Sequence, residues 1–408
     1  MTFMHVLLIH QSFASLDEAG GTRHYELARL LIRAGHRVTV ITGTVNYLSG
    51  QVESEPAVHQ EDGLTICRVP LYSAYHRSFF HRLLSFFSFT WSAFWAGMRV
   101  KGVDIVWGTS PPIFQGVTAW ALARWKRVPF LFEVRDLWPR FAIAMGVIRH
   151  PCIIAASEAL ERFLYRQADQ VVVNSPGFLE HVQGRGARRV ALIPNGADPL
   201  MFQANATGQD LRHRYHLEGK TIVLYAGAHG PANDLDVVLE AARLLEGSPI
   251  HFLLIGDGKD KPRLQQKAKE WGLNNVTFLP PAPKREIPAF LQMADIGLAI
   301  LKPLEEYKTT YPNKVFDYMA AGKPILLAID GVIRAVVEEA GCGIFVSPGD
   351  ARALAQAARQ LAADPSLQQA MGGRGRAYLE EHFSRQVLGE QFRQLLERML
   401  EEKESCRQ

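Results

Sequence analysis

The stretch Tyr311–Pro324, which reads YPNKVFDYMAAGKP, decides the fold of this 408-residue chain. It lies between two apolar runs, Ile296–Leu301 and Pro324–Ile329, that have the composition of buried β-strands. Pro312 is typical of the first turn of a helix, and Gly322 is typical of a helix end. The sequence therefore predicts a strand, a loop, a helix and a strand in succession, which is the repeating unit of an open α/β sheet.

The start of this helix carries residue types that suit an anionic sugar compound. Lys314 adds a positive charge where backbone N–H groups and the helix dipole already favour anions. Asp317 lies one turn further on, where its carboxylate can accept hydrogen bonds from a sugar diol. The alternative is an ordinary amphipathic helix that serves only the core, through Val315, Phe316 and Met319.

Strands and helices are expected to alternate through most of the chain, which favours parallel sheets with crossover helices. The strands predicted for a first lobe are His5–His10, Arg37–Thr42, Asp104–Thr109, Pro129–Val134, Gln170–Asn174 and Val190–Pro194. Those predicted for a second lobe are Ile222–Ala226, His251–Ile255, Val276–Leu279, Ile296–Leu301, Pro324–Ile329 and Gly343–Val346. Helices are expected at Thr22–Ala34 and from Ser384 onward, and Asn195–Gly219 reads as an irregular segment between the lobes. The predicted domains are residues 1–200, 201–383 and 384–408.

Four motifs occur in an order that resembles one protein family. They are HQSFASLDEAGGTRHYELARLLIRAGHRVTVIT from His10, FEVRDLWP from Phe132, IPNGADPLMF from Ile193 and the stretch from Tyr311. Along nearly all its length the chain resembles the bacterial retaining glycosyltransferases of the two-lobe GT-B, family 4 type. It is most similar to the fucosamine-transferase-like branch of O-antigen and capsule synthesis. The resemblance implies an α/β fold of two Rossmann-like lobes facing a cleft, with a C-terminal helix that crosses back to the first lobe.

The resemblance also implies an activity. The expected reaction is a metal-independent, retaining transfer of a hexosyl unit from a UDP-sugar to a lipid-linked saccharide in cell-surface polysaccharide synthesis. No cofactor, metal or nucleic-acid partner is expected besides the nucleotide sugar. Asp234-Leu235-Asp236 has the spacing of a metal motif but reads as a helix start. A two-lobe nucleotide-sugar epimerase and a non-catalytic nucleotide-sugar-binding scaffold are the alternatives.

The donor phosphates are expected at two glycine-containing loops. Gly20 and Gly21 precede a helix, where glycine lets the backbone approach a diphosphate, although a simple turn is equally compatible. The loop lacks the three-glycine dinucleotide fingerprint, which counts against an NAD enzyme. After the second lobe's first strand, relatives carry an Arg and a Lys, whereas this chain has Ala228 and His229. His229 is a candidate for binding the donor phosphates, and their charge is expected to be met by three lysines in order of preference, Lys261, Lys314 and Lys308.

The ribose and the transferred sugar are expected near Tyr311, Asn313 and Asp317. The family's pair of acids, eight positions apart, is only half present. Asp317 takes the second position, which binds the ribose hydroxyls, and Thr309 takes the first. Because a threonine cannot replace a carboxylate at the transferred sugar, the sequence favours a deoxy or amino sugar, unless Glu305 or Glu306 reaches the site.

The acceptor chemistry is expected after the first lobe's strand Pro129–Val134. Asp136 is the candidate for orienting the acceptor hydroxyl or taking its proton, and Arg135 is the candidate for the phosphates or for pairing with Asp136. A structural network of Glu133, Arg135 and Asp136 is the alternative, because buried charges need partners.

One segment, Phe79–Met98, is unusually aromatic and reads FFHRLLSFFSFTWSAFWAGM. Between Arg68 and Arg140 there are ten Lys and Arg residues against three acids, a net charge of +7, whereas the whole chain carries +4. The segment is too interrupted for a membrane span, and it suits a helix lying on an anionic bilayer. The alternative is a helix packed on the first sheet, with Ser85, Ser88 and Ser92 on its polar side.

The expected location is cytoplasmic, peripheral at the inner face of the cytoplasmic membrane. The N-terminal sequence MTFMHVLLIH lacks a basic region followed by a long apolar core, so no signal peptide is predicted.

Overall fold

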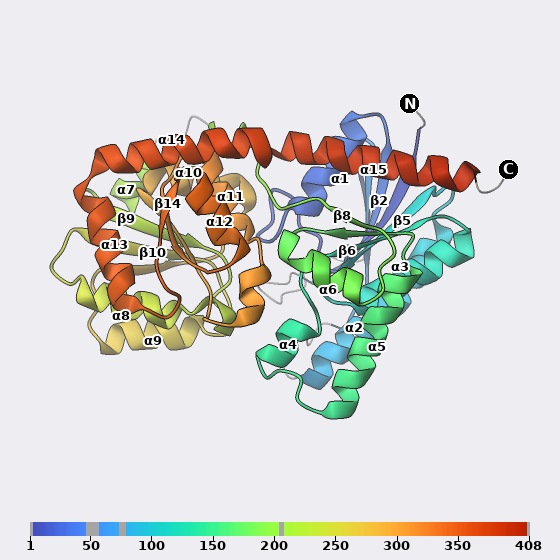
Figure 1. Ribbon diagram of the computed structural model, residues 1–408, viewed down its shortest axis with the longest axis horizontal. Helices are drawn as coiled ribbons and strands as arrows, with labels where there is room; N and C mark the ends of the chain where they lie inside the picture. Colours follow the sequence, from blue (N-terminus) through green and yellow to red (C-terminus); the bar gives the residue numbers. More distant parts are fainter. Residues whose placement is uncertain (1–2, 46–56, 73–78, 204–207, 406–408) are drawn as a thin grey trace. The chain divides into compact units, whose positions relative to one another are not determined.

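The computed structural model describes residues 3–45, 57–72, 79–203 and 208–405 and divides the chain into two compact units (Figure 1). Unit 1 takes the described residues of Met1–Ala14, Gly20–Pro194 and Gln386–Gln408, and unit 2 takes Ser15–Ala19 and Asn195–Arg385. The sequence analysis placed the boundary at residue 200, whereas the structure has it after Pro194.

Unit 1 is built on a sheet of eight strands. These are β1 (His5–Ile9), β2 (Arg37–Gly43), β3 (Val58–Glu61), β4 (Leu64–Val69), β5 (Ile105–Ser110), β6 (Phe130–Val134), β7 (Gln170–Val173) and β8 (Val190–Leu192). Their order is β3-β4-β2-β1-β5-β6-β7-β8, with every pair parallel except β3 and β4. The central strand β1 is buried throughout, as expected for a parallel strand covered by helices on both faces.

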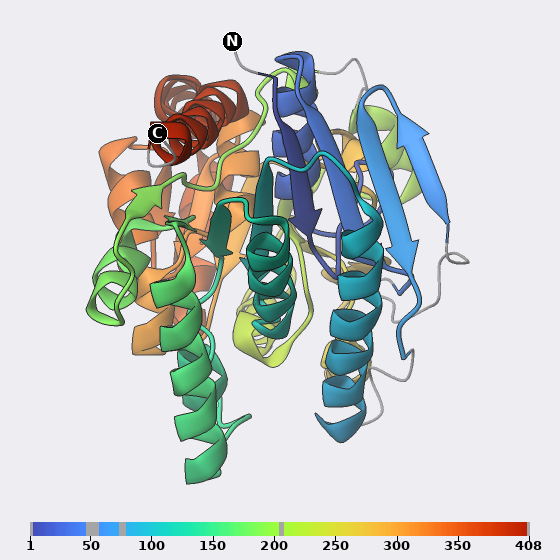
Figure 2. The ribbon, with the colours of Figure 1, turned by 90° about the vertical axis from the view of Figure 1, so that its right-hand side faces the viewer.

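Helices cover both faces of this sheet. They are α1 (Arg23–Arg33), α2 (Phe79–Arg99), α3 (Phe114–Lys126), α4 (Arg140–Ala144), α5 (Pro151–Gln167), α6 (Leu179–Gly184) and the part of α15 (Arg385–Ser405) from Gln386 onward. One face packs against α1 and α15, and the other packs against α2, α3 and α5, which Figure 2 shows in front of the sheet. On α15, Phe392 is fully buried, and its ring centre lies 4.7 Å from that of Trp107 on β5.

Unit 2 is built on a six-stranded parallel sheet. Its strands are β9 (Thr221–Ala226), β10 (Ile250–Ile255), β11 (Val276–Leu279), β12 (Ile296–Ile300), β13 (Ile325–Ala328) and β14 (Gly343–Phe345). The strand order is β11-β10-β9-β12-β13-β14, so the chain reverses its direction of progress between β9 and β12. Open α/β sheets bind their ligands outside the carboxyl ends of the strands at such a switch point.

Two helical layers enclose the sheet of unit 2. The helices α8 (Leu235–Leu244), α9 (Lys261–Glu270) and α13 (Ala351–Ala363) pack on one face. The other face packs against α7 (Gly208–Arg214), α10 (Ile287–Met293), α11 (Asn313–Ala320), α12 (Val332–Glu339) and α14 (Pro365–His382). The two-lobe α/β class predicted from the sequence is thereby confirmed.

The structure corrects details of the predicted elements. Every predicted strand is present, with ends that differ by one or two residues, but the hairpin of β3 and β4 was missed. The segment Asn195–Gly219, predicted to be irregular, contains α7. Pro312 was placed in the first turn of its helix, whereas it is the residue before α11, with extended backbone.

Candidate active site

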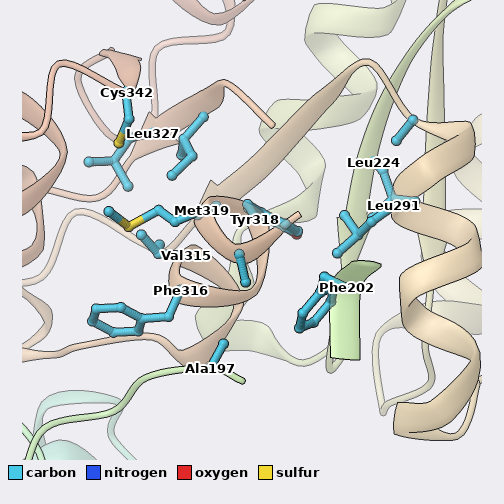
Figure 3. Close-up of a cluster of buried hydrophobic side chains, with 14 of the residues drawn as sticks. Ala197, Phe202, Leu224, Leu291, Val315, Phe316, Tyr318, Met319, Leu327 and Cys342 are labelled. Carbon is cyan, nitrogen blue, oxygen red and sulfur yellow. The ribbon is translucent and has the colours of Figure 1, made fainter. Parts of the chain in front are cut away.

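The helix α11 is fixed at the switch point of unit 2 by its buried side. Val315, Phe316 and Met319 are fully buried, and Figure 3 shows them in one apolar cluster with Tyr318. The Tyr318 hydroxyl donates to the carbonyl of Leu298 on β12 at 3.0 Å, and its oxygen accepts from the backbone N–H of Ala226 on β9 at 3.3 Å. The purely structural interpretation of α11 is therefore right for this side, and it leaves the other side and the first turn to chemistry.

Lys314, in the first turn of α11, presents an amine without a counter-charge. Its Nζ lies 3.6 Å from the centre of the Tyr225 ring on β9. A Cβ added to Gly227, just after β9, would lie 2.8 Å from this Nζ, so the lysine covers the end of that strand. Burial lowers the pKa of Lys314 to about 7. Within the described part of the chain the Lys314 amine has no carboxylate or carbonyl partner, so it is available to an anion.

His229 lies in the loop that follows β9. It is fully buried, and neither ring nitrogen has a hydrogen bond among the described residues. Glycine is required beside it, since a Cβ on Gly256 would lie 1.8 Å from the Gly227 carbonyl oxygen. Burial lowers the pKa of His229 to about 4, and the charges of Lys261 and Lys314 act in the same direction. The ring is therefore neutral near pH 7, and it can offer a hydrogen bond but no charge to a phosphate.

The other two predicted lysines are already occupied. The Lys261 amine donates to the carbonyls of Gly256 and Leu279, at 2.7 and 2.8 Å, and so closes the ends of β10 and β11. Lys308 pairs with Glu305 at 2.7 Å on the surface. The sequence ranked Lys261 first, but the structure favours Lys314. Of the three lysines, Lys314 alone lacks such a partner.

Asp317 is held by a lysine that the sequence analysis missed. Lys284 and Asp317 are both almost fully buried, and the Lys284 Nζ lies 2.5 Å from the Asp317 Oδ1. Asn313 lies one turn earlier, with its Nδ2 3.4 Å from each carboxylate oxygen. Lys284 had no recognisable signal, since it lies in the charged stretch Lys284–Glu286 far from Asp317 in the sequence.

Tyr311, predicted near the donor sugar, packs its ring on two phenylalanines. Its ring packs on Phe316 and Phe383, with ring centres 5.6 and 6.0 Å away. Burial raises the pKa of Tyr311 to about 12. Its carbonyl accepts a hydrogen bond from Asn195 at 2.7 Å. The half-buried ring thus also packs on the core, and its role at the sugar stays a prediction.

In unit 1, the network around Glu133 differs from the one considered in the sequence analysis. Glu133 is fully buried and accepts hydrogen bonds from Arg23 Nε at 2.7 Å, His24 Nε2 at 2.8 Å and Trp107 Nε1 at 3.0 Å. Burial alone would raise the pKa of Glu133, but His24 and Arg23 hold it well below its usual range. Glu133 is thus held by side chains of α1 and β5.

Arg135 and Asp136 follow β6 at the carboxyl end of the sheet. Arg135 donates from Nε to Thr109 Oγ1 at 3.0 Å and from Nη2 to the Pro111 carbonyl at 2.9 Å, which braces the chain after β5. Asp136 is half-buried. Burial raises the pKa of Asp136 to about 6, against the opposing effect of Arg135. A carboxylate with a raised pKa is suited to general-base work near neutral pH.

The loop before α1 carries the two predicted glycines. Gly20 and Gly21 are exposed, and Gly20 has a positive φ of 156°. A Cβ on Gly20 would lie 3.0 Å from the Cβ of Ala14, whereas a Cβ on Gly21 would meet open space. His10, at the end of β1, was not singled out in the sequence. It is buried against His24, with ring centres 4.3 Å apart, and its ring nitrogens have no partner among the described residues.

Asp234-Leu235-Asp236, interpreted from the sequence as a helix start, lies at the beginning of α8. Asp236 pairs with Arg263 and Lys267 on α9, at 2.5 and 2.6 Å, and Asp234 precedes α8. In the described part of the chain, no three His, Cys, Asp or Glu side chains are grouped as a metal site would need. Likewise, no helix of the described residues has the length and apolar character to cross a membrane.

Two family models match the chain in succession. The model described as Glycosyl transferase 4-like domain matches residues 19–196, and the model described as Glycosyl transferases group 1 matches residues 209–378. The two matches take in most of both units, and the chain belongs to this family of two-lobe glycosyltransferases.

The chain is similar to a protein of Escherichia coli strain K12 provisionally named colanic acid biosynthesis glycosyl transferase WcaI. The two are 27% identical over 352 residues, which cover 82% of this chain and 86% of the relative. Among solved structures, sucrose-phosphate synthase from Thermosynechococcus elongatus matches with a TM-score of 0.78 and 19% identity, over 97% of this chain and 99% of that one. Anabaena HepE, solved with UDP and glucose, matches with a TM-score of 0.74 and 16% identity, over the same shares. These structures confirm the GT-B fold, and the fucosamine-transferase-like branch stays a prediction.

Proposed function

We propose that this protein transfers a hexosyl unit from a UDP-sugar to a lipid-linked saccharide, with retention of configuration, during synthesis of a cell-surface polysaccharide. The proposed location is peripheral, at the inner face of the cytoplasmic membrane. The role in polysaccharide synthesis is supported by the name of the E. coli relative, and the UDP donor is supported by the UDP and glucose bound to HepE.

The observation that carries the proposal is the amine of Lys314. It lies at the switch point of unit 2, over the Tyr225 ring and against Gly227, with no anion beside it in the described chain. It also sits at the N-terminal end of α11, where the helix dipole favours negative charge. When the bond between the sugar and the diphosphate breaks, negative charge develops on the departing phosphate oxygens. Lys314 can stabilise that charge, and one such preorganised donor is worth about 10²–10³ in rate.

Beside this phosphate position, Asp317 and Asn313 supply the polar groups for the ribose. The Lys284 amine contacts Asp317 Oδ1 at 2.5 Å and holds the carboxylate beside the first turn of α11, where it can accept a hydrogen bond from a ribose hydroxyl. His229 adds a neutral hydrogen-bonding group below the strand end. Lysine and backbone would then take over the charge compensation that a divalent cation performs in other transferases.

Thr309 supports the proposal of a deoxy or amino sugar as the transferred unit. Its hydroxyl donates to the Glu306 carbonyl at 2.6 Å, so this position lends no carboxylate to the transferred sugar. A donor that lacks one hydroxyl or carries an amino group in its place fits this absence better than glucose does. On the acceptor side, Asp136 has the raised pKa that receiving or orienting a hydroxyl proton requires.

Binding of UDP to the purified protein tests the proposal. UDP should raise the melting temperature in the presence of a chelator. Lys314→Ala should weaken binding by removing a phosphate contact, and Asp317→Ala should weaken it by removing a ribose contact. Lys269→Ala is the matched control, because Lys269 is exposed on α9 away from the switch point. Full affinity in both site variants, or an absolute need for Mg²⁺, would contradict the proposal.

Product analysis separates the alternatives. Transfer to an acceptor extract, or slow donor hydrolysis, identifies a glycosyltransferase. Interconversion of the donor sugar without acceptor identifies an epimerase. Tight UDP binding with neither reaction identifies a scaffold, which the threonine at 309 and the occupied Lys261 would help to explain.

A further inference from the structure

The helix α2 in unit 1 has two apolar faces, and only one of them is used by the core. Ser85, Phe89 and Ala93 are fully buried at a spacing of four residues and face the sheet. Gly97 continues this line, and a Cβ there would lie 2.4 Å from a Leu122 methyl on α3, so the two helices pack closely. The alternative interpretation, a helix packed on the first sheet, holds for this face, but Ser85 belongs to the buried face and not to the polar side on which that alternative placed it.

The opposite face of α2 presents large apolar side chains to solvent. Leu84, Phe87, Trp91 and Trp95 recur at spacings of three and four residues, which places them on one side of a helix. Their exposed fractions are 39%, 51%, 67% and 46%. The two indoles are neighbours, with ring centres 5.8 Å apart. We call these four residues the α2 stripe, and at 1.5 Å per residue it is about 16 Å long.

A further exposed aromatic residue lies on α3, whose end is tied to the end of α2. Trp125, near the end of α3, is 67% exposed. Its neighbour Lys126 donates to the carbonyls of Met98 and Val100 at the end of α2, at 3.4 and 2.6 Å. This ties the last turn of α3 to the last turn of α2. Single exposed apolar residues are ordinary on protein surfaces. A row of large apolar side chains along one helix face is typical of a surface that binds a partner or a membrane.

The charge around the α2 stripe indicates what covers it. Residues 79–127 contain six Lys and Arg against one acid, Asp104, a net charge of +5. The carboxylate of Asp104 is engaged with the backbone N–H of His5 at 2.8 Å. Four of the basic side chains are exposed at the ends of α2 and α3, namely Arg99, Lys101, Arg124 and Arg127.

We infer that the α2 stripe, with Trp125 and its basic surroundings, is the surface by which this protein docks on an anionic lipid bilayer. Tryptophan and phenylalanine side chains enter the boundary between headgroups and acyl chains, and the neighbouring arginine and lysine side chains pair with anionic headgroups. A protein partner would need a flat apolar strip bordered by acidic side chains. An anionic membrane supplies apolar acyl chains and negative headgroups anywhere on its surface. The inference deepens the proposed function and rests on it in one respect, since a lipid-linked acceptor brings the enzyme to a membrane.

Sedimentation with vesicles tests the inference. The full-length protein is mixed with vesicles of phosphatidylcholine containing about one third phosphatidylglycerol, and with vesicles of phosphatidylcholine alone. Binding to the anionic vesicles should exceed binding to the neutral ones at least tenfold and should weaken as salt rises, because charges are screened over about 8–10 Å at physiological ionic strength. The double variant Trp91→Ser/Trp95→Ser should lose at least tenfold in vesicle affinity, and Arg124→Glu/Arg127→Glu should lose the preference for anionic lipid.

Two matched controls come from unit 2. Leu244→Ser removes a comparably exposed apolar side chain, and Arg352→Glu reverses an exposed charge on α13, so neither should change vesicle binding. Melting temperature and UDP binding, measured on every variant, show that the fold and the donor site are intact. Wild-type protein that ignores anionic vesicles, or tryptophan variants that bind them as well as wild type, would overturn the inference.

The same experiments separate the inference from the proposed function. A wild-type protein that binds UDP but not vesicles would contradict the inference about the α2 stripe and leave the proposed function standing. Absence of UDP binding in a protein that docks on vesicles concerns the donor site alone. A wild-type dimer that becomes monomeric in Trp91→Ser/Trp95→Ser, without vesicle binding in either, would assign the stripe to a second copy of the chain and so overturn the inference.

Discussion

At the scale of single residues, the proposed donor site depends on Lys314, whose amine is only partly protonated near neutral pH. Burial over the Tyr225 ring lowers the pKa of Lys314 to about 7, so near neutral pH a large fraction of the free protein lacks this charge. A diphosphate is an opposite charge, which favours the protonated amine and raises its pKa again. Binding of UDP is therefore linked to uptake of a proton.

This linkage predicts a direction for the pH dependence of UDP affinity. Affinity should be highest below about pH 7 and should fall as pH rises above it, by up to tenfold per pH unit, because the free protein then loses the proton that the complex needs. Titration calorimetry in buffers of different ionisation enthalpy measures both the affinity and the proton uptake. Lys314→Ala should show weaker binding without this dependence above pH 7. A wild-type affinity that is constant across that range would contradict the prediction.

A second residue prediction concerns Asp136. Its pKa is raised to about 6, so as a base it is ionised above that pH and protonated below it. Transfer should therefore fall about tenfold per pH unit below pH 6. Asp136→Asn should lower kcat by about 10²-fold or more while UDP affinity is little changed. Steady-state kinetics with a lipid-linked acceptor measures this, and near wild-type turnover in the variant would make Asp136 structural.

Whether a site residue could be predicted from the sequence depends on whether its partner is near to it in the chain. Lys314 and Asp317 could be proposed together from the sequence because both belong to one helix start, where spacing alone places them close to each other. The occupation of Lys261 by two strand-end carbonyls was out of reach, because it depends on how β10 and β11 end in space. Lys284 was missed for the same reason, since its partner Asp317 is remote in the chain.

At the scale of elements, long apolar strands were predictable and weakly patterned ones were not. The strand β3 reads VHQE and is exposed along its whole length, so it lacks the apolar alternation that identifies a strand. The turn that follows it, Asp62-Gly63, did carry a signal. Asp-Gly between two short strands is typical of a tight hairpin, and both residues have positive φ, 38° and 86°.

The packing of α11 against β12 gives a testable prediction. Gly297 on β12 lies under the Tyr318 ring, and a Cβ there would come within 2.5 Å of it. Gly297→Ala should therefore displace α11 and cost about 1–3 kcal/mol, the usual range for overpacking, with a loss of UDP affinity as the first turn moves. Gly373→Ala on α14 is the control, since its Cβ meets open space and an alanine favours the helix. Chemical unfolding and UDP titration measure both effects, and an unchanged UDP affinity in Gly297→Ala would contradict the coupling.

At the scale of the whole molecule, unit 1 is assembled from segments far apart in the chain. Leu388, Phe392 and Leu396 on α15 are buried in the same cluster as residues of β1, β2 and β5. The sequence predicted the terminal helix and, through the family resemblance, its return to the first lobe. Periodicity could not show which face of the sheet it would complete.

The contribution of α15 can be measured with one substitution. Phe392→Ala removes a fully buried ring from the cluster around Trp107 and should lower the free energy of unfolding of unit 1 by about 3–5 kcal/mol. Val387→Ala, on the exposed side of the same helix, should change it by no more than about 0.5 kcal/mol. Denaturant unfolding followed by tryptophan fluorescence provides the measurement. Equal effects of the two substitutions would mean that α15 is dispensable to unit 1.

Because α15 follows unit 2 in the sequence, the fold also sets an order of events during synthesis. Domains usually fold one after another as they leave the ribosome, with the N-terminal one first. Here the residues that complete unit 1 begin at Gln386, after the whole stretch from Asn195 to Arg385 has been made. At about 5–20 residues per second, unit 1 waits on the order of 10 to 40 seconds with the apolar groove for α15 open. Apart from Ser15–Ala19, which are made early, unit 2 is continuous and can close in that interval, so the first half of the nascent chain is the last to complete its core.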